Sequence, residues 1–189
     1  MDFALTDEQE MIVDTIRTFV DRELVPHEDD VERLGEVPPD LVTGIRRRSL
    51  DAGIYAANMP TEFGGGGLDN LTMAMVDRAF GWTQYALHYI VARPSNILQA
   101  CTGDQVEDYL IPTVRGERVD CLAMSEPGAG SDLAGLRSSA IRDGDDWIVN
   151  GQKIWTTGAQ ISDWGILVVR KQSRWALHFP NPSQAPEPA

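Results

Sequence analysis

Residues 123–132 read Ala-Met-Ser-Glu-Pro-Gly-Ala-Gly-Ser-Asp, a short apolar run that passes directly into a loop of small residues. Residues 121–124 have the length and composition of a buried strand, and turn-forming residues follow them. Small side chains let a planar or phosphorylated ligand approach the backbone, and the amides of Gly128 and Gly130 could turn toward one anion as a nest. The stretch therefore indicates a strand followed by a candidate binding loop, with an ordinary tight turn as the alternative.

A second segment, residues 150–159, reads Asn-Gly-Gln-Lys-Ile-Trp-Thr-Thr-Gly-Ala. Asn150-Gly151 is a strong short-range hairpin signal, and it predicts a strand over 152–156. Such a hairpin would present Trp155 for stacking on an aromatic ligand, while Thr157 hydrogen-bonds the polar edge of that ligand. Packing of the indole across neighbouring strands is the alternative for any single tryptophan.

Further strand-length apolar runs occur on both sides of these segments. They predict strands over 138–142, 146–149 and 165–170, and thus a small antiparallel sheet with an open edge. Residues 171–189 lose this periodicity, and their closely spaced prolines predict a disordered end. These prolines are Pro180, Pro182, Pro186 and Pro188.

Before residue 120, apolar residues recur at helical spacing. Thr6 and Gln9 have the spacing of a capping box, ahead of a helix that should stop at Pro26. Further helices are expected over 38–53, from about residue 69, over 82–92 and over 104–113. The fold class is therefore predicted as α+β, with an all-α domain over 1–119, an incomplete antiparallel β-domain over 120–170 and an aberrant tail over 171–189.

The composition excludes several classes of function. Sixteen Lys and Arg against 29 Asp and Glu give a net charge of −13, which disfavours nucleic acid and anionic membranes as partners. No apolar run approaches the roughly 18–20 residues of a membrane span, and the acidic start lacks a secretory n-region, so a cytoplasmic location is expected. Two cysteines and three scattered histidines show no ligand spacing, so no metal site or disulfide is expected.

Together, the two segments resemble the acyl-CoA dehydrogenase family. The first signature of that family is a small residue, an aliphatic residue, Ser or Thr, Glu, two variable positions, a small residue and then Gly-Ser-Asp. Residues 123–132 fit it at every position, and Gly135 fits beyond it. The opening over 1–9, the loop PTEFGGGGLDN over 60–70 and the segment GQKIWTTGA over 151–159 extend the resemblance, which covers residues 1 to about 170.

The resemblance implies FAD as cofactor and α,β-dehydrogenation of an acyl-CoA thioester as reaction. In similar proteins the hydroxyl at the place of Ser125 and the amide at the place of Met124 contact the flavin ring, and Trp155 covers one ring face. Ser131 would contact both the flavin and the acyl-CoA substrate. The complete set of implied flavin contacts is Leu122, Ala123, Met124, Ser125, Gly130, Ser131, Trp155, Thr156 and Thr157.

The family takes its catalytic carboxylate from a C-terminal helical domain, so no catalytic residue is assigned in this chain. Glu126 and Asp132 are interpreted as residues that shape the loop. Electron-transfer flavoprotein or a similar acceptor is the implied partner, and the full-length parent is expected to be a homo-oligomer. The chain itself is expected to be an inactive fragment, from truncation or a frame shift. A flavin-dependent oxidase or monooxygenase of the same fold and a non-catalytic acidic binding module are the alternatives.

Overall fold

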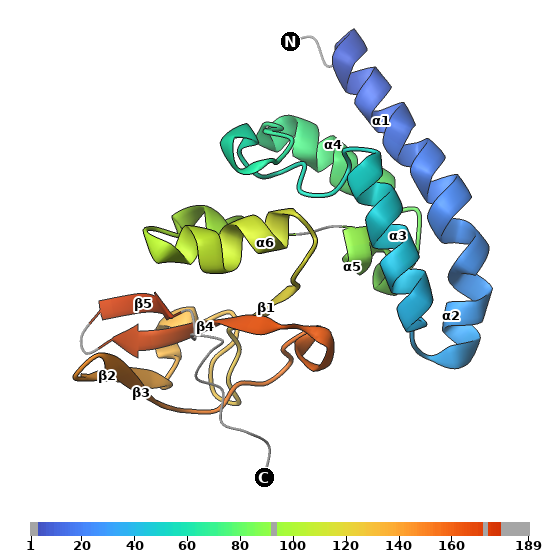
Figure 1. The fold of residues 1–189 in the computed structure, drawn as a ribbon. Coiled ribbons are helices and arrows are strands. Elements are labelled where there is room, and N and C mark those ends of the chain that lie inside the picture. The colour runs from blue at the N-terminus through green and yellow to red at the C-terminus, as the bar shows by residue number, and fades with distance from the viewer. Residues whose placement is uncertain (1–3, 92–93, 172–173, 179–189) are drawn as a thin grey trace. The chain divides into compact units, whose positions relative to one another are not determined.

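The computed structural model describes residues 4–91, 94–171 and 174–178 (Figure 1). The chain divides into two compact units, Met1–Glu117 and Arg118–Ala189. All α-helices lie in the first, here called the helical unit, and all strands lie in the second, the sheet unit, among the described residues.

The first helix, α1 (Asp7–Phe19), begins with the predicted capping box. The Thr6 hydroxyl accepts a hydrogen bond from the Gln9 amide at 3.2 Å, and the Gln9 side chain accepts one from the Thr6 amide at 3.1 Å. These bonds satisfy two amides that have no partner within the helix. Val13, Ile16 and Phe19 form the buried face of α1 and join the core of the helical unit.

Two π-helical turns each end two residues before a proline. Val20–Leu24 precedes Pro26, and Val106–Leu110 precedes Pro112. A proline ring clashes with the carbonyl four residues earlier, and a wider turn relieves that clash. We had expected the first helix to stop at Pro26, but the helical path continues past this residue. It continues as a 3₁₀ turn (Val25–His27) and α2 (Glu28–Leu34).

Of the remaining helices, those over Pro39–Asp51, Asn70–Phe80 and Tyr85–Val91 contribute residues to the core of the helical unit. Asp69 caps α4, because its carboxylate accepts hydrogen bonds from the amides of Leu71 at 2.8 Å and Thr72 at 3.0 Å. None of the described helices is long and apolar enough to cross a bilayer. The helices are α3 (Pro39–Asp51), α4 (Asn70–Phe80), α5 (Tyr85–Val91) and α6 (Ile111–Val114), with 3₁₀ turns at Thr61–Phe63 and Asn96–Ala100.

The sheet is mixed, which corrects the prediction of an antiparallel sheet. Its order is β1-β4-β2-β3, and β5 pairs with β4. β1 and β2 both run parallel to β4, whereas β2–β3 and β4–β5 are antiparallel. Long connections bring β4 back beside β1 and β2 in the same direction, and tight turns allow only the antiparallel pairs. The strands are β1 (Asp120–Ala123), β2 (Ser139–Asp143), β3 (Asp146–Asn150), β4 (Trp164–Lys171) and β5 (Arg174–His178).

The hairpin predicted at Asn150-Gly151 is absent. The tight turn lies between β2 and β3, where Gly144 has a φ of 61°, and residues 151–156 form no strand. Gly151 is instead needed for close approach, because a Cβ built on it would lie 2.1 Å from the Ser138 hydroxyl oxygen. The same dipeptide that often forms a turn serves here to pack one backbone against another.

The prediction of a disordered end from residue 171 is wrong for Arg174–His178, which forms β5. This segment lies before the first proline of the tail, Pro180, so each of its backbone amides carries a hydrogen. The register pairs Arg174 with Lys171 and His178 with Leu167. The prolines and the rest of the predicted tail, 179–189, lie outside the described residues.

Replacing Thr6 by alanine tests the capping box. Loss of the side-chain acceptor should lower the free energy of unfolding by about 1 kcal/mol, measured by urea denaturation followed by far-UV circular dichroism. Thr18→Ala is the matched control, because the Thr18 hydroxyl only donates to the Asp14 carbonyl on the exposed side of α1. The control should change the free energy by less than about 0.5 kcal/mol. Equal losses in both variants would argue against a stabilising cap.

Candidate functional site

The structure brings together the two segments that the sequence singled out. The first loop (residues 124–132) follows β1, and the second loop (residues 151–159) follows β3. The Ile154 amide donates a hydrogen bond to the Ser125 carbonyl at 2.9 Å. The Lys153 ammonium donates another to the Met124 carbonyl at 3.0 Å. The two loops therefore form one continuous surface feature of the sheet unit.

A buried ion pair reinforces this junction. The Lys153 ammonium lies 2.8 Å from a carboxylate oxygen of Glu126, and their side chains are only 9% and 7% exposed. The same carboxylate accepts hydrogen bonds from the backbone amides of Arg137 at 2.6 Å and Ser138 at 2.9 Å. A buried charge of this kind is tolerated because an opposite charge and further donors satisfy it.

The surroundings of Glu126 keep it ionised. Burial by itself raises the pKa of Glu126, but hydrogen bonds from Arg137, Lys153 and Ser138 outweigh burial and lower the pKa from 4.5 to about 2. A carboxylate with this pKa is a weak proton acceptor at neutral pH. Glu126 is therefore suited to holding the loops together and unsuited to general base chemistry.

The amides that bind Glu126 are themselves held from β4. The Arg170 guanidinium donates to the carbonyl of Leu136 at 2.7 Å and also to that of Ala134. The backbone amide of Arg170 donates to the Ser138 carbonyl at 2.8 Å. These bonds fix the backbone around residues 134–138, in which the amides of Arg137 and Ser138 bind the carboxylate.

The first loop turns tightly after Glu126. Glu126 and Ala129 exchange two backbone hydrogen bonds, of 2.8 and 3.2 Å, across Pro127 and Gly128. Neither Gly128 nor Gly130 has a positive φ. The loop therefore lacks the left-handed residue of an anion-binding nest, so our expectation of such a nest at these two glycines is wrong.

Trp155 combines two unusual properties. Its φ is 58°, a left-handed conformation that is rare for a bulky residue and costs on the order of 1–3 kcal/mol. It is also 86% exposed, so it is not buried in the core. The indole therefore does not pack across neighbouring strands, which was our alternative interpretation. The chain thus holds a large flat apolar side chain in solvent, in a strained conformation, one residue after the bond between Ile154 and Ser125.

The other predicted site residues occupy different environments. Leu122 and Ala123 are half-buried in β1, and Leu122 packs against a small cluster that contains Leu136 and Val168. Ser125 and Thr156 are half-buried beside the junction. The exposed members of the set are Met124, Gly130, Ser131, Trp155 and Thr157.

Sequence reasoning missed the roles of Lys153 and Arg170. A signal for Lys153 was available, because it is one of only two lysines in a chain with fourteen arginines. Because Lys153 follows Asn150-Gly151 closely, the segment was interpreted as a hairpin and Lys153 was given no role. No comparable signal marked Arg170, whose partners are main-chain carbonyls remote in sequence.

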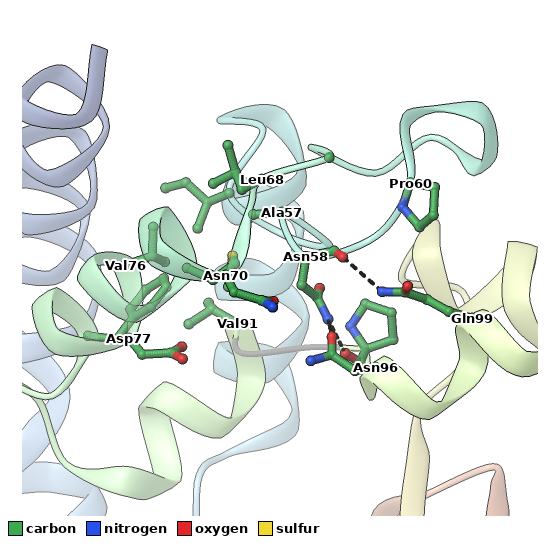
Figure 2. Close-up of a pocket in the computed structure, with 15 residues that line it drawn as sticks. Ala57, Asn58, Pro60, Leu68, Asn70, Val76, Asp77, Val91, Asn96 and Gln99 are labelled. Carbon is green, nitrogen blue, oxygen red and sulfur yellow. Dashed lines mark hydrogen bonds between the residues drawn. The ribbon is translucent and has the colours of Figure 1, made fainter. Parts of the chain in front are cut away.

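The helical unit contains a separate cavity of about 450 Å³ (Figure 2). Its wall includes Asn58, whose side-chain amide donates to the Pro94 carbonyl at 2.9 Å, and Gln99, which donates to the Asn58 carbonyl at 3.2 Å. None of the nine predicted flavin contacts lines this cavity. The described residues also contain no cluster of three or more His, Cys, Asp or Glu side chains that could hold a metal ion.

Replacing Glu126 by glutamine tests the role of the ion pair. Because the folded pKa lies below the unfolded value, ionised Glu126 stabilises the fold above about pH 4.5, and this stabilisation is lost as the pH falls toward about 2. The advantage of the wild type over Glu126→Gln in unfolding free energy should therefore shrink by about 2 kcal/mol between about pH 6 and about pH 3. Urea denaturation at a series of pH values measures it.

Glu62→Gln is the control for that titration, because Glu62 is exposed. As a surface substitution, it should change the free energy of unfolding by less than about 0.5 kcal/mol at neutral pH. A difference between Glu126→Gln and the wild type that stays constant from about pH 6 to about pH 3 would contradict the assignment of a buried, ionised carboxylate.

Residues 6–117 match the family model described as acyl-CoA dehydrogenase, N-terminal domain, and residues 121–179 match acyl-CoA dehydrogenase, middle domain. The second match extends past residue 170, where we had expected the resemblance to end, and includes β5. These two matches account for most of both units.

Individual relatives agree with the family models. The chain is 33% identical over 171 residues to a 3-(aryl)acrylate reductase of Clostridium sporogenes, covering 88% of this chain and 44% of that protein. It is 31% identical over 180 residues to the mitochondrial long-chain specific acyl-CoA dehydrogenase of Mus musculus, covering 92% and 41%.

A solved structure shows the same fold. The crystal structure of a glutaryl-CoA dehydrogenase from Mycobacterium smegmatis in complex with FADH2 matches with a TM-score of 0.83 and 22% identity, over 96% of this chain and 47% of that one. The chain thus spans less than half the length of these relatives. On the strength of its two domain matches, the chain belongs to the acyl-CoA dehydrogenase family.

Proposed function

We propose that this chain supplies the flavin-ring binding loops of an FAD-dependent enzyme that oxidises the Cα–Cβ bond of an acyl-CoA thioester. The observation that carries the proposal is the exposed, backbone-strained Trp155 held beside Ser125 by the bond from Ile154. Backbone strain of this kind persists where the surrounding structure imposes it and often marks a ligand site. A flat aromatic ligand would bury the indole and offset the cost of leaving it in water.

The residues of the two loops suit a flavin. Trp155 offers an apolar face for the ring, and Thr157 offers a hydroxyl for its edge. Met124 and Ser125 supply main-chain and hydroxyl donors at the end of β1. In this proposal the half-buried Leu122, Ala123 and Thr156 complete the wall, and the exposed Gly130 and Ser131 lie toward the thioester, with Ser131 in contact with it. When bound, FAD supplies the acceptor for the hydride that leaves Cβ.

Neither carboxylate of the first loop is a suitable base for the α-proton. The Glu126 carboxylate is committed to three donors and has a pKa of about 2. Asp132 is exposed at the far end of the first loop. We therefore propose that the base belongs to a part of the enzyme beyond this chain, and that the chain alone is catalytically incomplete.

We also propose an electron acceptor, an oligomeric state and a cellular location. An electron-transfer flavoprotein would take the electrons, and the complete enzyme would be a homo-oligomer. We do not propose a direction for the reaction, since one of the relatives is named as a reductase. A cytoplasmic location agrees with the two free, buried cysteines. Burial raises the pKa of the Cys101 thiol to about 11, which keeps that thiol unreactive.

Titration of the purified chain with FAD tests the flavin site. Addition of FAD should raise the midpoint of thermal unfolding and quench flavin fluorescence. Trp155→Ala should weaken FAD binding about tenfold or more, because stacking on an aromatic side chain contributes about 1–3 kcal/mol. Trp82→Ala is the matched control, since Trp82 is also an exposed tryptophan, at 75%, but lies in the helical unit. It should leave FAD affinity unchanged.

Other outcomes would change the proposal. Absence of any FAD effect on the wild-type chain would favour a non-catalytic binding module. An equal loss of FAD affinity in both tryptophan variants would indicate that the second loop is not part of the flavin site. In the full-length parent, bleaching of the flavin by acyl-CoA without oxygen would support the dehydrogenase. A flavin that acyl-CoA leaves oxidised would point to an oxidase or monooxygenase.

A further inference from the structure

The backbone of Ser125 is held on both sides by residues of the second loop. The carbonyl that precedes it, that of Met124, accepts a hydrogen bond from the Lys153 ammonium at 3.0 Å. The carbonyl of Ser125 itself accepts one from the Ile154 amide at 2.9 Å. Two successive peptide planes are therefore fixed before any ligand arrives.

Among the residues that the structure describes, none accepts a hydrogen bond from the amide of Ser125. No hydrogen bond among the described residues uses the N–H of Ser125, although its immediate neighbours on the chain are bonded. This N–H belongs to the same peptide group as the Met124 carbonyl, which receives the Lys153 ammonium. A cation at the oxygen draws electron density from the nitrogen, so the N–H becomes a stronger donor.

The burial of Lys153 makes this effect large. An ammonium in water is screened, whereas one that is 9% exposed acts through a medium of lower dielectric constant. Glu126 anchors the ammonium, and the amides of Arg137 and Ser138 share its negative charge. The Glu126 carboxylate thus allows Lys153 to be buried, while the two amides stabilise part of the negative charge of Glu126.

We propose that Lys153 is a positioning residue for the flavin: anchored by Glu126, it fixes and polarises the Met124–Ser125 peptide, so that the Ser125 N–H is a strong donor to the negative charge of the reduced ring. The inference rests on the proposed function, because it requires a flavin next to Ser125. It assigns to the ion pair an electrostatic role in addition to the cross-linking of the two loops.

Three variants separate the electrostatic role from a structural one. Lys153→Arg keeps the charge. Lys153→Met removes it and leaves Glu126 buried without its ion partner, so this variant should lose stability. The double variant Glu126→Gln with Lys153→Met removes both charges and should recover most of that stability. Lys171→Met, at the only other lysine of the chain, is the control.

Two measurements are made on each variant. The first is the chemical shift of the Ser125 amide proton in the chain without cofactor, which reports polarisation of the peptide. The second is the ratio of the dissociation constants of FAD and FADH2. The double variant should move the amide proton upfield and weaken FADH2 binding relative to FAD about tenfold, equal to about 30 mV for a two-electron couple. Lys153→Arg and Lys171→Met should resemble the wild type.

A stable double variant with wild-type values in both measurements would overturn the proposal and leave Lys153 a purely structural role. The two proposals fail separately. If the wild-type chain binds no flavin, the proposed flavin site fails. The amide shift still decides whether Lys153 polarises the peptide. An unchanged amide shift with a changed affinity ratio would also contradict the inference, because the effect would then bypass the Ser125 peptide.

Discussion

The buried ion pair between Glu126 and Lys153 holds two loops of the sheet unit together. Glu126 belongs to the loop after β1 and Lys153 to the loop after β3, and among the described residues no regular strand pairing connects these two loops. Removing one partner of a buried pair typically costs about 3–5 kcal/mol, because the other charge is left without compensation. That cost disfavours any arrangement in which the two loops separate. The amides of Arg137 and Ser138, and Arg170 behind them, extend the same network into the sheet.

The positions of Ser125 and Trp155 follow from this network. The Ile154 amide bonds to the Ser125 carbonyl, two residues after the end of β1, and Trp155 follows Ile154 directly with a positive φ. Left-handed backbone at a tryptophan is unfavourable locally, so neighbouring contacts must impose it. Lys153, two residues earlier, is bound to both Met124 and Glu126 and supplies such contacts. Strain at one residue is thereby balanced by a buried charge pair close to it in the chain.

Local signals in the sequence predicted local structure well. The capping box at Thr6 involves residues three positions apart, so spacing alone identifies it. The helix predicted from about residue 69 begins at Asn70. The direction of strand pairing was predicted incorrectly, because β1 meets β4 across about forty residues and no local pattern encodes that contact. Asn150-Gly151 failed for a related reason. This dipeptide often forms a turn, but here Gly151 lies close to Ser138 in a tertiary contact that the local sequence does not encode. The resemblance predicted a set of site residues, but it assigned no role to Lys153, which bonds to Met124 and Glu126.

The burial of Lys153 determines how strongly its charge acts on its neighbours. An exposed cation is screened by salt, so its effect on a ligand is small. In a chain with a net charge of −13, the exposed predicted site residues include the hydroxyls of Ser131 and Thr157, which need no positive charge. A single ammonium inside the sheet unit, where screening is weak, can act through one peptide group on one donor. An acidic protein can therefore stabilise negative charge on a ligand with a positive charge that solvent scarcely contacts.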